Sequence, residues 1–261
     1  MPVFLQPIMN DQKPRAVGAL LLEIGALLMG SGANTNRVRL TISRIARSYG
    51  YKVDFLITHR AIMLTLNDKK HHFFSEIKQT YALVPNFKMV SGISKLSWRI
   101  VEDKPPLETV WEEVDRLKML SPYPRIVVLS MVALACGSFC RLAGGSFTEM
   151  LMVFAASFCG LFFKQVLTKK RVNPYFTVFL ASFITAMLCG GIGLLYPYEQ
   201  NNVTFVTSIL YLIPGIPLIN SMSDFIDGNS LNGLMRAING LLISFAIASG
   251  LLIAILIFNA A

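Results

Sequence analysis

The chain has 261 residues, of which 54% are hydrophobic and only 15% are charged. Soluble domains carry about 25% charged residues, so this composition excludes an ordinary soluble globular protein. The formal net charge is +9, yet the densest basic run is Lys169–Arg171 and no nucleic-acid-binding module is recognisable. We therefore predict no nucleic-acid partner and assign the charge to the cytoplasmic face of a membrane protein.

The charged residues gather in the first part of the chain. Residues 1–124 hold 17 Lys or Arg and 11 Asp or Glu, whereas residues 125–261 hold only 7 and 4. This split predicts a small α+β cytoplasmic domain over residues 1–121, followed by a transmembrane domain over residues 122–261. The fold class is accordingly an α-helical integral membrane protein with a small α+β domain before its spans.

The first domain is predicted to mix helices and strands. Residues 16–29 are apolar enough to be mistaken for a span, but they contain Glu23 and end at Gly30–Gly32, which favours a buried helix. Asn34 or Thr35 can cap a second helix, which ends at Gly50. The pattern then predicts two strands and two helices: 52–57, 61–66, 86–102 and 107–120.

No catalytic, metal-binding or cofactor-binding pattern is recognisable. A phosphate-binding loop and a dinucleotide glycine fingerprint are both lacking, so we expect neither a cofactor nor an enzymatic activity. The histidines have no accompanying cluster of Cys or carboxylate residues, and the cysteines all lie in apolar segments, which predicts no metal site and no disulfide framework. These residues are His59, His71, His72, Cys136, Cys140, Cys159 and Cys189.

Five apolar segments of the second domain are predicted to cross the bilayer, because about 20 residues of helix span its hydrocarbon core. They cover about 125–143, 147–166, 174–196, 202–219 and 235–258. Lys164, Lys169–Arg171 and Arg236 then fall on the cytoplasmic side together with the N-terminus, and the C-terminus is periplasmic or extracellular. An odd number of spans leaves no internal pair of equal halves, so we expect a second membrane subunit or self-association.

The fourth segment is unlike an ordinary span. Pro214 and Pro217 each remove a backbone donor, and a proline inside a helix costs about 3 kcal/mol, so we predict a break at Gly215. Freed backbone groups at membrane depth are tolerated when they are buried in protein or line a wet cavity, as in the binding sites of transporters. The alternative is that the break only marks the end of a helix.

Two carboxylates follow this break. Asp224 and Asp227 are three residues apart and are predicted to share a helical face, with Asn220 one turn earlier and Arg236 as a counter-charge. A carboxylate inside the bilayer would indicate a proton or substrate relay, whereas one in a cytoplasmic loop would imply little. The sequence leaves the depth of both residues open.

The chain resembles the N-terminal half of the bacterial threonine/serine exporter family. One matching stretch is residues 18–50, with Gly32-Ala33 followed by Arg37-Val38 and with Asn34 where the family often has Ser or Thr. The other runs from Pro214-Gly215-x-Pro217 through Asn220 and Asp224 to Arg236. We take Gly32, Asn34 and Arg37 as a cytoplasmic-domain motif. The proposed substrate or ion pathway comprises Pro214, Gly215, Pro217, Asn220, Asp224, Asp227 and Arg236.

The resemblance implies an exporter in the bacterial inner membrane. Its ten spans would come from this half and a second five-span half, which a separate partner or self-association supplies. Threonine, serine and small dicarboxylates such as succinate are the implied substrates, and the proton gradient is the implied driving force. The alternatives are a membrane-anchored regulator or scaffold with a ligand-binding cytoplasmic domain, and an intramembrane enzyme, for which the spans lack a nucleophile or metal set.

Overall fold

The computed structural model describes residues 6–67, 73–80, 85–120, 123–195 and 202–260. The chain folds into two compact units. The first unit comprises Met1–Pro122 together with Ile216–Ala237, and the second comprises Tyr123–Gly215 together with Ile238–Ala261. A division of the sequence at residue 121 therefore leaves out Ile216–Ala237, a C-terminal stretch that packs with the N-terminal unit.

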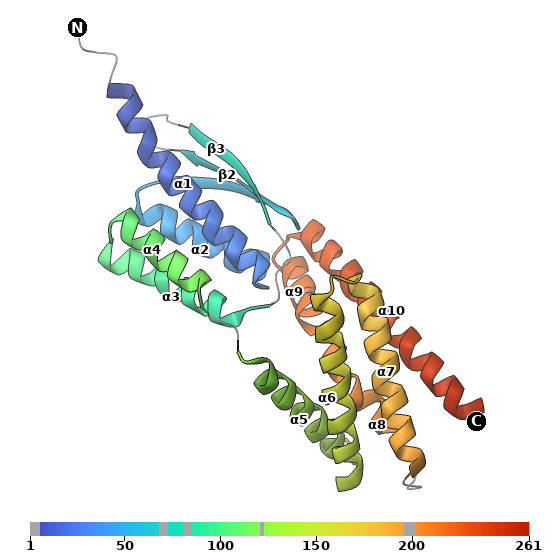
Figure 1. Ribbon diagram of the computed structural model, residues 1–261. Helices are drawn as coiled ribbons and strands as arrows, with labels where there is room; N and C mark the ends of the chain where they lie inside the picture. The colour runs from blue at the N-terminus through green and yellow to red at the C-terminus, as the bar shows by residue number, and fades with distance from the viewer. Residues whose placement is uncertain (1–5, 68–72, 81–84, 121–122, 196–201, 261) are drawn as a thin grey trace. The chain divides into compact units, whose positions relative to one another are not determined.

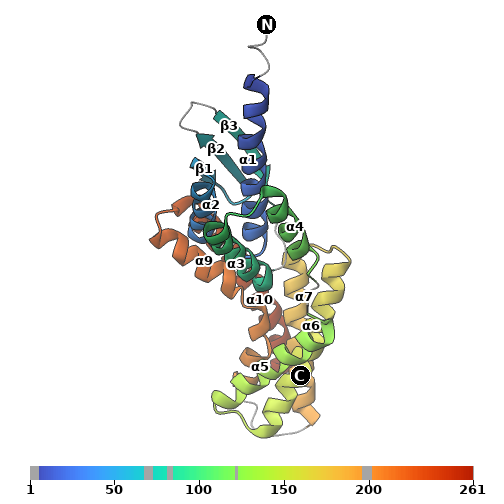
Figure 2. The ribbon, with the colours of Figure 1, turned by 90° about the vertical axis from the view of Figure 1, so that its left-hand side faces the viewer.

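The first unit combines helices with a small antiparallel sheet of order β1-β2-β3 (Figure 1). Figures 1 and 2 show the sheet and α4 on opposite sides of α1. The elements are α1 (Gln6–Gly30), α2 (Thr35–Ser48), β1 (Lys52–Ile57), β2 (Ala61–Asn67), β3 (Phe73–Gln79), α3 (Phe87–Asp103) and α4 (Leu107–Lys118).

Helix α1 forms the centre of this unit. Leu20, Leu21, Ile24 and Leu28 are at most 1% exposed, and the helix contacts the sheet, α2, α3 and α4. A helix that is apolar on all sides must be enclosed by protein or lipid, and here protein encloses it. The prediction of a buried helix over residues 16–29 is confirmed.

The sequence prediction missed strand β3. Its residues pair in antiparallel register with β2, and Lys78 stands opposite the buried Ile62. Lys78 forms an ion pair with Glu23 of α1, and Glu23 Oε1 also lies 2.8 Å from Lys118 Nζ of α4. Because a charged side chain occupies a core-facing register position, the alternation of apolar and polar residues that marks a strand is broken.

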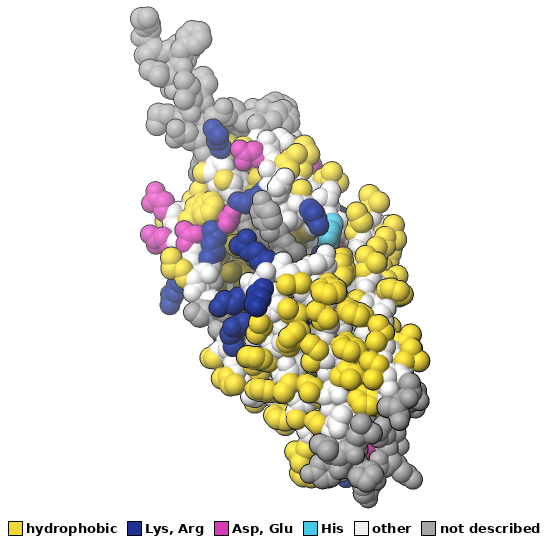
Figure 3. Space-filling view, turned by 45° about the vertical axis from the view of Figure 1, so that its right-hand side comes forward, with side chains coloured by type: hydrophobic (Ala, Val, Ile, Leu, Met, Phe, Trp, Pro, Cys, Tyr) yellow, Lys and Arg dark blue, Asp and Glu magenta, His cyan; other side chains and the backbone are white. Residues whose placement is uncertain are grey.

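The second unit is helical and strongly apolar. By length and composition, four helices could cross a membrane, and the helices before and after Pro214 could do so together as a bent pair. Large hydrophobic side chains are exposed on these helices, and Figure 3 shows them covering this part of the visible face. The helices are α5 (Arg125–Leu142), α6 (Phe147–Lys169), α7 (Pro174–Leu195), α8 (Asn202–Ser208) and α10 (Ser230–Ala260).

The fourth predicted span is two helices. Helix α8 is followed by a short 3₁₀ helix, η1 (Leu210–Leu212), and α9 (Gly215–Ile226) begins after Pro214. Pro217 lies in the first turn of α9, where a missing backbone donor costs nothing, so it does not interrupt the helix. The segment therefore breaks before Gly215 and runs on to Ile226, seven residues beyond the predicted end at 219.

The ion cluster at Glu23 makes the stability of the first unit depend on pH. Burial raises the pKa of Glu23, but hydrogen bonds and charges from Lys118 and Lys78 outweigh it and hold the pKa below its usual 4.5. A depressed pKa stabilises the fold above the ordinary value, and this stabilisation is lost as the pH falls through the folded-state pKa. Glu23→Gln should therefore lower the thermal unfolding midpoint at pH 7 and have less effect at pH 3.

Tryptophan fluorescence of the full-length protein in detergent measures this midpoint, because Trp98 and Trp111, the two tryptophans of the chain, both belong to the first unit. Glu102→Gln, at an exposed position of α3, is the matched control. Equal midpoints for wild type and Glu23→Gln at pH 7 would contradict the role given to the cluster.

Candidate functional site

The turn before α2 is the centre of the candidate site. Gly32 has a φ of +91°, a left-handed conformation that favours glycine. Asn34 caps α2, because its side-chain oxygen accepts a hydrogen bond of 2.8 Å from the backbone N–H of Arg37. The first turn of α2 contains no acidic residue, so the helix itself supplies no negative charge to its own N-terminus.

Asp224 of α9 supplies that charge from 189 residues away in the sequence. Its Oδ1 accepts a 3.1 Å hydrogen bond from the backbone N–H of Thr35, the first residue of α2. Its Oδ2 lies 3.2 Å from Nη1 of Arg236 on α10. Asp224 is fully buried, and a buried carboxylate requires such compensation by a cation and by donors. The predicted counter-charge is thus observed as an ion pair.

Further hydrogen bonds join the same turn to α9 and α10. The side-chain amide of Asn232 donates to the backbone oxygen of Ile57 at 2.8 Å and to Thr35 Oγ1 at 3.3 Å. Three consecutive residues of the turn also form hydrogen bonds: Gly32 and Ala33 accept through their backbone oxygens, and Asn34 donates through its side chain. These contacts are Asn220 Nδ2 to the Gly32 oxygen at 2.8 Å, Arg236 Nη2 to the Ala33 oxygen at 3.2 Å, and Asn34 Nδ2 to Ser223 Oγ at 3.0 Å.

The ion pair retains unused hydrogen-bonding capacity. Asp224 Oδ2 and Arg236 Nη1 are not aligned as a hydrogen bond, and within the described part of the chain neither atom has another hydrogen-bond partner. Buried polar atoms are rarely left in this state without a reason. Oδ2 of Asp224 and Nη1 of Arg236 therefore compensate each other by charge alone.

The structure brings together five of the residues that the sequence singled out: Gly32, Asn34, Asn220, Asp224 and Arg236. The prediction that Asp224 and Asp227 share a helical face is wrong. Helix α9 ends at Ile226, so Asp227 lies beyond its end and is exposed while Asp224 is buried. Pro214 and Gly215 belong to the second unit, and Arg37 takes part through its backbone N–H, which donates to Asn34.

Three residues of the site were missed from the sequence. Thr35 was considered only as a cap, although its backbone N–H and hydroxyl both take part. Ser223, the residue before Asp224, was not singled out, although its hydroxyl accepts a hydrogen bond from Asn34. Asn232 was not considered. An amide near the start of a long apolar helix is a polar residue that needs a partner, and this signal could have identified it.

In the second unit, polar side chains from α6 and α7 surround the break in the fourth span. Ser157 Oγ donates a 2.8 Å hydrogen bond to the backbone oxygen of Ser208, at the end of α8. Tyr211 of η1 shares a 2.8 Å hydrogen bond with Thr185. Lys164 Nζ lies 5.9 Å from the Tyr211 ring centroid. The hydrogen bond from Ser157 supplies a donor to a backbone oxygen at the end of α8, where the regular helical hydrogen bonds stop.

Lys164 lies within the second predicted span, 147–166, and helix α6 continues three residues further, to Lys169. The sequence also predicted no metal site. Among the described residues, no group of three or more His, Cys, Asp or Glu could hold a metal ion. His71 and His72 lie outside the described residues.

Comparison with known proteins identifies the family of the chain. The family described as "Putative threonine/serine exporter" matches residues 19–258, nearly the whole chain. The chain belongs to the threonine/serine exporter family. The match includes both the turn before α2 and the residues of α9 and α10 that hold it. It is a family of multi-pass membrane transporters, in keeping with the apolar helices.

Individual relatives of this family fall into two lengths. The chain is 28% identical to "Probable succinate transporter subunit YjjP" of Escherichia coli, over 96% of this chain and 98% of that protein. It is 24% identical to the "Threonine/serine exporter" of Corynebacterium glutamicum, over 95% of this chain but 53% of that protein. It spans 47% of a relative from Mycobacterium tuberculosis. No solved structure matches the chain.

The packing around the break in the fourth span can be tested by substituting a glycine. A methyl group at Gly160 would overlap Thr185 Oγ1 and lie 2.6 Å from the Tyr211 hydroxyl, whereas one at Gly191 would meet nothing within 4 Å. Gly160→Ala should therefore displace the Tyr211–Thr185 hydrogen bond and destabilise the protein, by about 1–3 kcal/mol for an overpacked site. Gly191→Ala is the matched control.

Size-exclusion chromatography in detergent, before and after mild heating, measures the monodisperse fraction of each variant. We expect a clear loss for Gly160→Ala and none for Gly191→Ala. Equal behaviour of the two variants would mean that the contacts around the break are looser than described.

Proposed function

We propose that the chain is one subunit of a secondary exporter of small metabolites that carry a carboxylate group, either threonine/serine-type amino acids or dicarboxylates such as succinate. It acts without enzymatic chemistry in the bacterial inner membrane, with its N-terminal unit in the cytoplasm and its C-terminus on the opposite side. Transport is coupled to protons and requires a second five-span membrane half.

The observation that carries this proposal is the ion pair between the fully buried Asp224, on the second helix of the discontinuous span, and Arg236 of α10. A fully buried carboxylate is costly to remove from water, and such groups gather at functional sites. Broken helices form the binding sites of many secondary transporters, because their freed backbone groups can face a solute. Here the broken span ends in α9, and α9 carries the carboxylate that contacts both Arg236 and α2.

The chemistry of the pair suits an exported carboxylate. The guanidinium of Arg236 binds Asp224 through Nη1 without a well-aligned hydrogen bond, so a solute carboxylate can replace Asp224 as its partner. Protonation of Asp224 would neutralise the displaced carboxylate and make this exchange favourable. The solute carboxylate and the proton would then act on the same ion pair, which links the protonation of Asp224 to solute binding.

A second half is proposed from the lengths of the relatives. YjjP, which the chain covers almost end to end, is named a transporter subunit, and the exporters of Corynebacterium and Mycobacterium are about twice as long as the matched region. Five candidate spans cannot be divided into two equal repeats, and transporters are commonly built from paired repeats. A partner chain or a second copy of this chain would complete the pair.

Replacing Asp224 with Asn should abolish transport. The amide keeps an acceptor for the Thr35 N–H but removes the charge that holds Arg236, and breaking a buried ion pair costs about 3–5 kcal/mol. Efflux of labelled threonine, serine and succinate is measured from cells that express the chain with and without the candidate partner. We expect partner-dependent efflux of at least one solute and a loss of about tenfold or more in Asp224→Asn.

Asp227→Asn is the matched control, because this exposed carboxylate lies three residues along the chain and makes no contact with Arg236 within the described ion pairs. Its efflux should equal that of wild type. Protein levels in isolated membranes are compared for all variants. Efflux by Asp224→Asn at the wild-type rate would reject the role of the pair, and the absence of efflux for every solute would reject the proposed substrates.

A further inference from the structure

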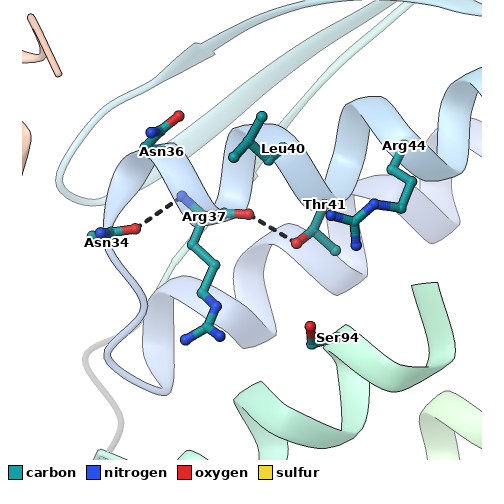
Figure 4. Close-up of a pocket in the computed structure, with 7 residues that line it drawn as sticks. All are labelled: Asn34, Asn36, Arg37, Leu40, Thr41, Arg44 and Ser94. Carbon is teal, nitrogen blue, oxygen red and sulfur yellow. Dashed lines mark hydrogen bonds between the residues drawn. The ribbon is translucent and has the colours of Figure 1, made fainter. Parts of the chain in front are cut away.

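A recess on the first unit lies beside the turn that holds Asp224. It has a volume of about 350 Å³, within the range of small-ligand sites and too small for a macromolecular partner. Its walls come from α2 and α3 and include Asn34, Arg37, Thr41, Arg44 and Ser94. Figure 4 shows the Arg37 and Arg44 guanidinium groups on the side of α2 that faces Ser94.

The recess is cationic. Two arginines line it and no carboxylate does, and neither arginine forms one of the ion pairs found among the described residues. Arg37 and Arg44 are seven residues apart, which is about two helical turns, so they lie on one face and about 10 Å apart along the axis. This arrangement suits a small ligand with an anionic group at each end.

Arg44 is held in position for such a ligand. Its Nη1 donates a 2.7 Å hydrogen bond to Oγ of the buried Ser97, which in turn donates to the backbone oxygen of Ser94 at 2.7 Å. Its guanidinium carbon lies 3.8 Å from the centroid of the Trp98 ring. An arginine has five donors, and a side chain already fixed by packing loses little freedom when the remaining donors bind an anion.

We propose that this recess binds a small dicarboxylate, with Arg37 and Arg44 each binding one carboxylate group. The site lies within the first unit, apart from the Asp224–Arg236 pair, and its existence does not depend on whether the chain transports. Asn34 forms one wall, and its amide donates to Ser223 of α9. A bound ligand therefore stabilises the turn that holds α9, which gives the metabolite a regulatory influence on the broken span.

Trp98 allows a direct test, because it stacks on Arg44 and becomes the sole tryptophan in a Trp111→Phe background. Succinate is titrated at constant ionic strength into the full-length protein in uncharged detergent, in parallel with propionate, which has one carboxylate group. We expect saturable quenching or enhancement of Trp98 fluorescence by succinate, with at least tenfold weaker binding of propionate. Equilibrium dialysis of labelled succinate measures the same binding independently.

Arg37→Gln and Arg44→Gln should each weaken succinate binding about tenfold or more. Arg47→Gln removes the same charge from an exposed position of α2 outside the recess and should leave the affinity unchanged. The proposal is overturned if dialysis shows no difference between wild type and the Arg37→Gln/Arg44→Gln double variant, or if Arg47→Gln weakens binding equally. Dialysis measures succinate binding directly and does not require transport. A failure of the proposed transport function therefore cannot produce either of these two outcomes.

Discussion

A fully buried carboxylate placed against the start of α2 is the constraint on which the rest of the first unit depends. Helix α2 carries Arg37, Arg39, Arg44 and Arg47 but no acidic residue. Its N-terminus therefore receives its negative charge from Asp224 on α9, and Arg236 on α10 completes the compensation. This arrangement requires the left-handed turn at Gly32, which exposes three consecutive residues to donors and acceptors of α9 and α10.

The same constraint holds two stretches that are far apart in the sequence together within the first unit. The stretch Ile216–Ala237 contains α9 and the start of the long helix α10, and it packs with the first unit rather than the second. Any movement of α9 must break the contacts of Asp224, Asn220 and Ser223 with the turn. A solute carboxylate at Arg236 and a dicarboxylate in the recess on α2 would act on this one junction with opposite effects, the first releasing α9 and the second retaining it.

The elements that were predicted correctly are those specified by residues close together in the sequence. The buried helix α1, the cap at Asn34 and strands β1 and β2 follow from hydrophobic periodicity and from turn chemistry. Strand β3 was missed because Lys78 occupies a core-facing position whose partner, Glu23, is 55 residues away. The separation of buried Asp224 from exposed Asp227 could not be predicted either, since the end of α9 at Ile226 depends on how the chain turns into α10. Asn232 and Thr35 are paired 197 residues apart, a contact that no spacing rule describes.

The most direct test of the junction is a double-mutant cycle between Asp224 and Arg236, which isolates their interaction from the effect of each substitution alone. Thermal unfolding of wild type, Asp224→Asn, Arg236→Gln and the double variant is measured in detergent through the tryptophans of the first unit. A coupling free energy of about 1.5–3 kcal/mol would show that the pair holds α9 and α10 to α2. Effects that add to within about 0.5 kcal/mol would contradict that claim, because independent sites behave in this way.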